Sequence, residues 1–63
     1  MKARPRSEVM YRFGGTLYPC YIYCYPQQKW DYVYTSDKVE LRYKNMTITI
    51  TTYDFKEHWL EVN

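Results

Sequence analysis

Two cysteines and one histidine are the residues of this 63-residue chain whose types could support metal, redox or acid–base chemistry. Cys20 and Cys24 lie in the stretch LYPCYIYCYP, residues 17–26. In a helix, residues four apart are neighbours on one face and could share a ligand. In an extended strand they lie about 13 Å apart, at roughly 3.3 Å per residue, whereas a disulfide needs Cα atoms within about 7 Å. The chemistry of the pair therefore depends on the local backbone.

This stretch is predicted to be extended. It is rich in Tyr and Ile, and Pro19 and Pro26 would interrupt a helix but fit the start and end of a strand. We therefore expect Cys20 and Cys24 to be reduced and to act as small apolar residues, with no metal or other cofactor. A zinc or redox role and pairing between chains are the alternatives.

The single histidine, His58, follows Asp54 by four residues. The only serines, Ser7 and Ser36, lie in the basic N-terminal segment and in a predicted turn, so no well-placed nucleophile accompanies the histidine, and we expect no enzyme. Asp54 and Glu57 instead resemble a capping box, which predicts a helical turn before a last extended segment.

Composition predicts one small aromatic-rich domain. A chain of 63 residues buries only about 60% of its unfolded surface, and nine Tyr, two Trp and two Phe compensate for this. The net charge is +2, to which Lys2, Arg4 and Arg6 in the N-terminal segment contribute +3, so the rest of the chain is slightly acidic. We predict a basic flexible arm over residues 1–7 and a single β domain over residues 8–63.

No stretch approaches the roughly 18 apolar residues of a membrane span, and no apolar segment of the secretory type follows the basic N-terminus. We expect a cytoplasmic protein without membrane contact.

Most of the chain alternates with the period of two that is typical of strands. Gly14 and Gly15 predict a turn after the first such segment. The segments are residues 9–13, the cysteine stretch, 30–35, 39–44 and 46–51.

Short connections predict the register of these strands. Turns at Lys44-Asn45 and Ser36-Asp37 would place large apolar side chains on one face, with the pairs Tyr43–Met46, Leu41–Ile48, Val39–Ile50, Tyr34–Val39, Tyr32–Leu41 and Trp30–Tyr43. A third hairpin with residues 26–29 as its loop would add the pairs Tyr25–Trp30, Tyr23–Tyr32 and Tyr21–Tyr34. This register would leave the two cysteines, Ile22 and Val33 on the opposite face.

The expected fold is all-β: a small SH3-like barrel or a strongly curved antiparallel sheet of five or six strands, with a short helical turn before the last strand. The segment FKEH at residues 55–58 and the strand WDYVY at residues 30–34 resemble small SH3-type proteins of Bacillus phages and prophages. The resemblance covers about half of the chain and implies the fold. The Ala-Leu-Tyr-Asp-Tyr signature and the acidic loop of peptide-binding SH3 domains are absent, so a proline-rich ligand is not implied.

The favoured function is a non-catalytic protein-interaction module, with a phage-type factor or a self-associating adaptor as its forms. Exposed apolar clusters mark interaction sites, so the expected binding surface contains Cys20, Ile22, Cys24 and Val33, with Tyr18 and Trp59 at its rim. The alternative is that the strand at residues 9–13, or the curvature of the barrel, covers this patch. The partner is an unidentified protein or a second copy of the chain.

The alternative function is binding of single-stranded nucleic acid by aromatic stacking and a basic track. The candidate basic residues are Lys2, Arg4, Arg6, Arg42 and Lys44. Seven acidic residues oppose the basic ones, and the predicted register buries most of the rings, so this function is less favoured.

Overall fold

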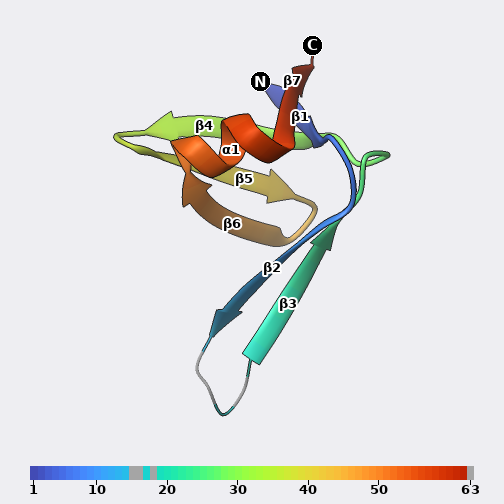
Figure 1. The fold of residues 1–63 in the computed structure, drawn as a ribbon, viewed down its shortest axis with the longest axis vertical. Coiled ribbons are helices and arrows are strands. Elements are labelled where there is room, and N and C mark those ends of the chain that lie inside the picture. The colour runs from blue at the N-terminus through green and yellow to red at the C-terminus, as the bar shows by residue number, and fades with distance from the viewer. Residues whose placement is uncertain (15–16, 18, 63) are drawn as a thin grey trace.

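The computed structural model describes residues 1–14, 17 and 19–62, and its strands form two separate sheets (Figure 1). A five-stranded antiparallel sheet has the order β6-β5-β4-β1-β7, and β2 and β3 form a two-stranded antiparallel sheet. The elements are β1 (Lys2–Pro5), β2 (Val9–Gly14), β3 (Pro19–Cys24), β4 (Trp30–Thr35), β5 (Lys38–Tyr43), β6 (Met46–Thr51), α1 (Thr52–His58) and β7 (Trp59–Val62). The expected class, a curved antiparallel β fold with a short helix before the last strand, is confirmed, although the five-stranded sheet does not close into a barrel.

The β4–β5–β6 meander has the predicted register. Tyr32 lies opposite Leu41 on β5, which in turn lies opposite Ile48 on β6. Ser36 and Lys44, the first residues of the two turns, have φ values of 53° and 55°. Positive φ at this position is found in the mirror-image turns that match the twist of paired strands. The alternation of side chains therefore determines this half of the sheet, with its apolar face inward.

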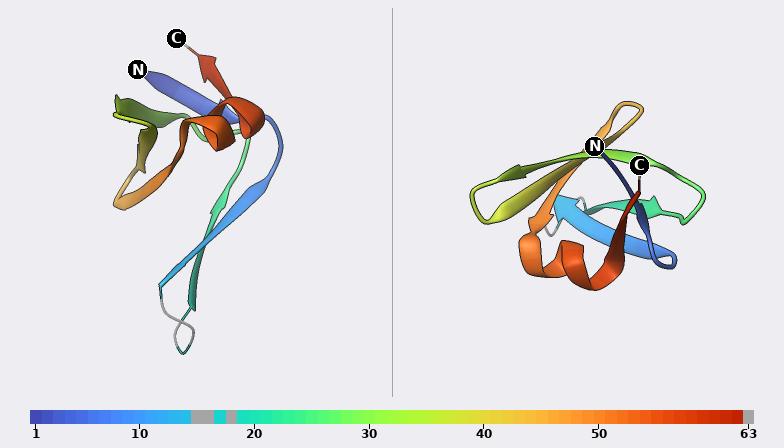
Figure 2. Two further views of the ribbon diagram at one scale, coloured as in Figure 1. Left: turned by 60° about the vertical axis from the view of Figure 1, so that its left-hand side comes forward. Right: turned by 90° about the horizontal axis from the view of Figure 1, so that it is seen from above.

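Helix α1 connects β6 to β7, the two outer strands of the five-stranded sheet. Outer strands of a flat five-stranded sheet would lie about 19 Å apart, whereas a seven-residue helix spans about 10 Å. The sheet must therefore curl, as the view from above in Figure 2 shows. The helix begins at Thr52 and not near Asp54, because the Thr51 hydroxyl caps it by accepting from the Asp54 amide at 3.0 Å.

The N-terminal residues differ from the expected flexible arm, because residues 2–5 form β1 between β4 and β7. Ala3 and Pro5 are buried, while Lys2 is exposed and its Nζ lies 2.8 Å from an Asp31 carboxylate oxygen. Small apolar and charged residues thus alternate here with the period of a strand. The net positive charge of this segment concealed that pattern.

The predicted third hairpin is wrong, because β3 pairs with β2 and β1 occupies the place beside β4. The loop after β3 is a compact turn in which the Gln28 amide donates to the Tyr25 carbonyl at 2.9 Å. This loop carries the chain from one sheet to the other. The inward face of β3 is consequently reversed: Ile22 and Cys24 are buried, and Tyr21 and Tyr23 are exposed.

One hydrophobic core joins the two sheets and α1. Trp30 is completely buried, and its ring stacks on Tyr43 at 5.2 Å and meets the Trp59 ring edge-on at 5.8 Å. Phe55 of α1 closes the core against the Tyr32 ring at 5.1 Å. Besides Pro5, the buried residues are Ala3, Ile22, Cys24, Trp30, Tyr32, Val39, Leu41, Ile48, Ile50, Phe55 and Trp59.

No helix among the described residues is long and apolar enough to cross a membrane.

Candidate protein-interaction surface

The β2–β3 hairpin projects away from the five-stranded sheet, and its two strands make up the lower part of the molecule in Figure 1. The molecule measures 38 Å along its longest axis and 22 Å along its shortest. Within the described part of the chain, neither β2 nor β3 pairs with a third strand. The hairpin is therefore a two-stranded ribbon, an arrangement that is only marginally stable by itself in water.

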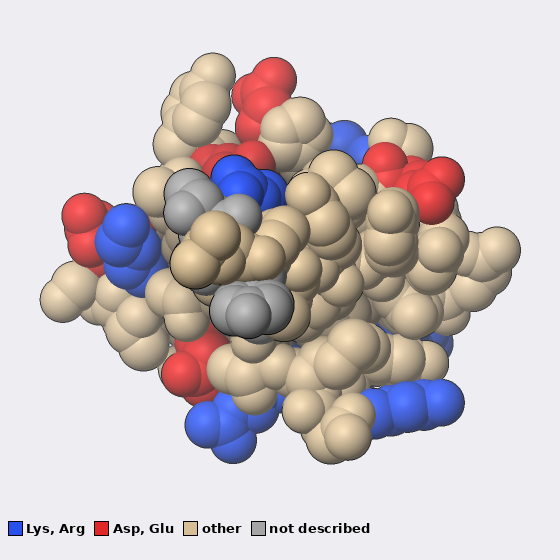
Figure 3. All heavy atoms as spheres, turned by 90° about the horizontal axis from the view of Figure 1, so that it is seen from below, with Lys and Arg blue, Asp and Glu red and all other residues tan. Residues whose placement is uncertain are grey.

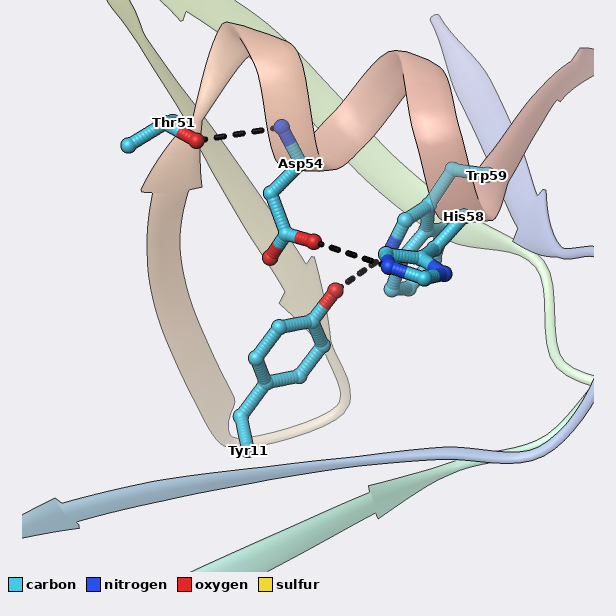
Figure 4. Close-up of polar contacts among 5 residues, drawn as sticks. All are labelled: Tyr11, Thr51, Asp54, His58 and Trp59. Atoms are coloured by element: carbon cyan, nitrogen blue, oxygen red, sulfur yellow. Dashed lines mark hydrogen bonds and ion pairs between the residues drawn. The ribbon is translucent and has the colours of Figure 1, made fainter.

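The base of the hairpin is attached to the core by its inward face. Ile22 lies opposite Tyr11, and Cys24 opposite Val9; Ile22 and Cys24 are buried, and Tyr11 and Val9 are partly buried against the core. The indole Nε1 of Trp59 donates to the Tyr11 hydroxyl at 2.9 Å (Figure 4). This bond ties β2 to the start of β7.

The Tyr11 hydroxyl also lies near α1. Burial raises the pKa of Tyr11 well above its ordinary value, and the neighbouring Asp54 carboxylate raises it further. Asp54 faces His58 one turn later on α1, with an oxygen–nitrogen distance of 3.4 Å (Figure 4). The polar residues that suggested acid–base chemistry therefore lie where the hairpin meets the helix, and Tyr11 is held there as a neutral phenol.

The outward face of the hairpin is exposed, and three of its four side chains are aromatic or apolar. Met10 lies opposite Tyr23, and Arg12 lies opposite Tyr21. The exposed fractions of Met10, Tyr21 and Tyr23 are 47%, 47% and 48%. Seen from below, uncharged side chains cover most of the central part of the molecule, and most charged side chains lie toward its margin (Figure 3). We call Met10, Arg12, Tyr21 and Tyr23 the hairpin face.

The cysteines lie on the opposite side of the ribbon from the hairpin face. Both are free and both belong to the single strand β3, so the predicted extended backbone is confirmed. Cys24 is completely buried at the base, and burial raises the pKa of its thiol to about 11. Cys20 is exposed, because the ribbon has left the core by the time it reaches this residue. Among the described residues, no three His, Cys, Asp or Glu side chains gather as a metal site.

The structure does not bring the predicted binding residues together. Ile22, Cys24 and Trp59 are buried in the core, so they form no exposed patch or rim. Val33 is exposed on the five-stranded sheet, where it lines a shallow depression of about 310 Å³ with Asp31, Tyr32, Glu40 and Arg42. Cys20 alone of the set is exposed on the hairpin, and Tyr18 lies outside the described residues.

The predicted basic track is interrupted by acidic neighbours. Lys2 pairs with Asp31, and the Arg42 Nε lies 3.1 Å from a Glu40 carboxylate oxygen. The hydrogen bond from Lys2 lowers the pKa of the Asp31 carboxyl. Lys44 lies 5.5 Å from the centre of the Tyr43 ring. Arg4 is half-buried on β1, and Arg6 is exposed just after it.

The hairpin face was not predicted, because the predicted third hairpin placed Tyr21 and Tyr23 in the core. The signal that could have found it is the Gly14-Gly15 pair in the sequence, because a turn predicted there favours pairing of residues 9–13 with the cysteine stretch. In the register of β2 and β3 that the structure shows, Ile22 and Cys24 share a face with Val9 and Tyr11. The tyrosines, whose hydroxyls are better placed in water, then point outward.

Comparison of the chain with protein-family models, with curated proteins and with solved structures found no match. The resemblance to SH3-type phage proteins therefore stays a prediction, and the proposal of a function depends on the geometry of the hairpin.

Proposed function

We propose that the chain is a non-catalytic protein-interaction module that binds through its β2–β3 hairpin. The observation that carries this proposal is the hairpin face, where Met10, Tyr21 and Tyr23 are each about half exposed on a ribbon that projects from the core. Exposed aromatic and Met side chains are enriched in protein interfaces. Covering them would bury apolar surface and would also stabilise a ribbon that is marginal without a partner.

The attachment of the hairpin suits this role. Tyr11 and Trp59 hold its base, so the hairpin face is presented at a defined angle and less ordering is required on binding. The exposed side chains of the hairpin face come from strands, which position them more rigidly than a loop would.

Single-stranded nucleic acid is the less favoured ligand. Tyr21 and Tyr23 would suit base stacking, and Arg12 lies across from Tyr21. However, of the residues that would contact phosphates, Lys2 and Arg42 are paired with carboxylates.

The proposal is tested by affinity capture with immobilised protein from a nuclease-treated extract of the natural host. The hairpin variant is Tyr21→Lys/Tyr23→Lys, and the matched control is Val33→Lys, which changes a residue of similar exposure on the other sheet. We expect the wild type and Val33→Lys to retain the same proteins, and the hairpin variant to lose them. Equal retention by all three proteins would refute the proposal.

A further inference from the structure

We infer that the partner of the hairpin is a second copy of this chain, which pairs antiparallel along the free edge of β3. The result is a continuous four-stranded sheet of order β2-β3-β3-β2 across a two-fold axis. This inference rests on the proposed function and names the partner of the β2–β3 hairpin.

The second edge of β3 carries backbone donors and acceptors that no strand of the described chain satisfies. Exposed edges of this kind template the addition of another strand, and natural proteins usually protect them with charged residues. No residue from 13 to 28 carries a charge. Pro19 interrupts the edge only at the first position of β3, so residues 20–24 carry neither the charges nor the prolines that protect an edge.

The other uncharged edge, β6, is partly occupied. Tyr11 and Arg12 of β2 line a depression of about 200 Å³ together with residues 47–50 of β6. The hairpin thus lies with β2 beside the five-stranded sheet, and β3 is its outer strand. A new strand therefore finds free access at β3.

The sequence of β3 favours a copy of itself as that strand. Residues 20–24 read Cys-Tyr-Ile-Tyr-Cys, which is the same in both directions. With Ile22 on the two-fold axis, Tyr21 of each copy lies opposite Tyr23 of the other, and Cys20 lies opposite Cys24. Closed two-fold interfaces of this kind are self-complementary. Tyrosine therefore lies opposite tyrosine on one face of the new sheet and cysteine opposite cysteine on the other, and no charged side chains face each other across the axis.

The pairing joins the two hairpin faces into one surface with four half-exposed tyrosines. Cross-strand aromatic pairs are among the stabilising pairs of antiparallel sheets. A strand edge buries less than the roughly 1,200 Å² that is typical of stable interfaces. We therefore expect a dimer that forms as the protein concentration rises and not a permanent one.

The first experiment measures self-association by sedimentation equilibrium in a reducing buffer, over about two decades of concentration from roughly 5 µM. We expect a monomer–dimer equilibrium in the wild type and in Val33→Lys. Tyr21→Lys places two ammonium groups beside the axis, so the dissociation constant should rise about tenfold or more. Tyr23→Glu, which places two carboxylates there, should also weaken self-association. A mixture of the two variants should dimerise again, because Lys at position 21 then faces Glu at position 23.

The second experiment determines the register by isotope-filtered NMR on a mixture of labelled and unlabelled chains. We expect intermolecular contacts between the rings of Tyr21 and Tyr23. Circular dichroism verifies that each variant is folded.

A strict monomer, a dimer that Tyr21→Lys leaves unchanged, or intermolecular contacts that exclude β3 would each overturn the inference. The proposed function is judged separately. If the chain is a monomer but the hairpin variant still loses retained proteins, self-pairing fails and the proposed function stands. If hairpin and control variants behave alike in both assays, both fail.

Discussion

Gln28 connects the two sheets, and its replacement should destabilise the fold more than a half-exposed loop residue normally would. Its side-chain oxygen accepts from the Tyr25 amide at 3.0 Å and from the indole Nε1 of Trp30 at 3.1 Å. Trp30 is completely buried, so its indole N–H depends on this acceptor. Gln28→Met keeps the length of the side chain and removes the oxygen.

The expected loss follows from the burial of one of the two donors, the Trp30 indole. A buried donor left without a partner costs about 1–3 kcal/mol, whereas the Tyr25 amide is exposed and can bond to water. The total stability of a 63-residue domain is roughly 3–9 kcal/mol. A loss of about 2 kcal/mol would lower the melting temperature by roughly 8–16 °C.

Urea unfolding followed by tryptophan fluorescence measures this effect. Gln28→Met should lower the midpoint without changing the slope, since the surface exposed on unfolding stays the same. Gln28→Glu, whose carboxylate can accept both hydrogen bonds, is the matched control and should lie close to the wild type. The reasoning is refuted if Gln28→Met unfolds at the wild-type midpoint, or if Gln28→Glu is destabilised as strongly as Gln28→Met.

Two further predictions concern ionisable groups. Hydrogen bonding to Glu61, followed by burial, raises the pKa of Tyr32 to about 12. As the pH rises, the unfolded chain therefore loses the Tyr32 proton before the folded chain does, and the folded state becomes less stable. The urea midpoint of unfolding should fall between about pH 10 and 12, and it should fall less steeply with pH in Tyr32→Phe. The same dependence on pH in both proteins would contradict the assignment. The thiols should also differ, because Cys20 is exposed and Cys24 is buried with a raised pKa. In dilute native protein iodoacetamide should modify Cys20 rapidly and Cys24 only in denaturant, and equal rates would show that the base of the hairpin is open.

Local reasoning was sufficient for the β4–β5–β6 meander because its turns contain two residues each. A two-residue turn leaves one register, and one alternating pattern then assigns every side chain to a face. The same logic failed at residues 26–29, where the chain passes from one sheet to the other. A four-residue loop does not reveal whether the next strand pairs with the last one.

The location of the hairpin face depends on whether β3 pairs with β4 or with β2. Residues 20–25 alternate tyrosine with cysteine or isoleucine, so both faces of β3 are apolar and periodicity does not distinguish them. What decides is competition for the edge of β4. Lys2 and Ala3 of β1 pair with β4 at this edge, and β3 pairs with β2 instead.

By itself, the amino-acid sequence determined the β class, the register of the central meander, the short helix before the last strand and the extended backbone at the cysteines. Each of these depends on neighbours a few residues apart. Only the tertiary structure decided that the N-terminus is a strand, that Ile22 and Cys24 face the core and that the tyrosines of β3 are exposed. These features depend on pairing between residues far apart in the chain, such as Ala3 with Trp30 and Glu61. Several segments have local sequences that are compatible with a strand, and the local sequence does not determine which two of them pair.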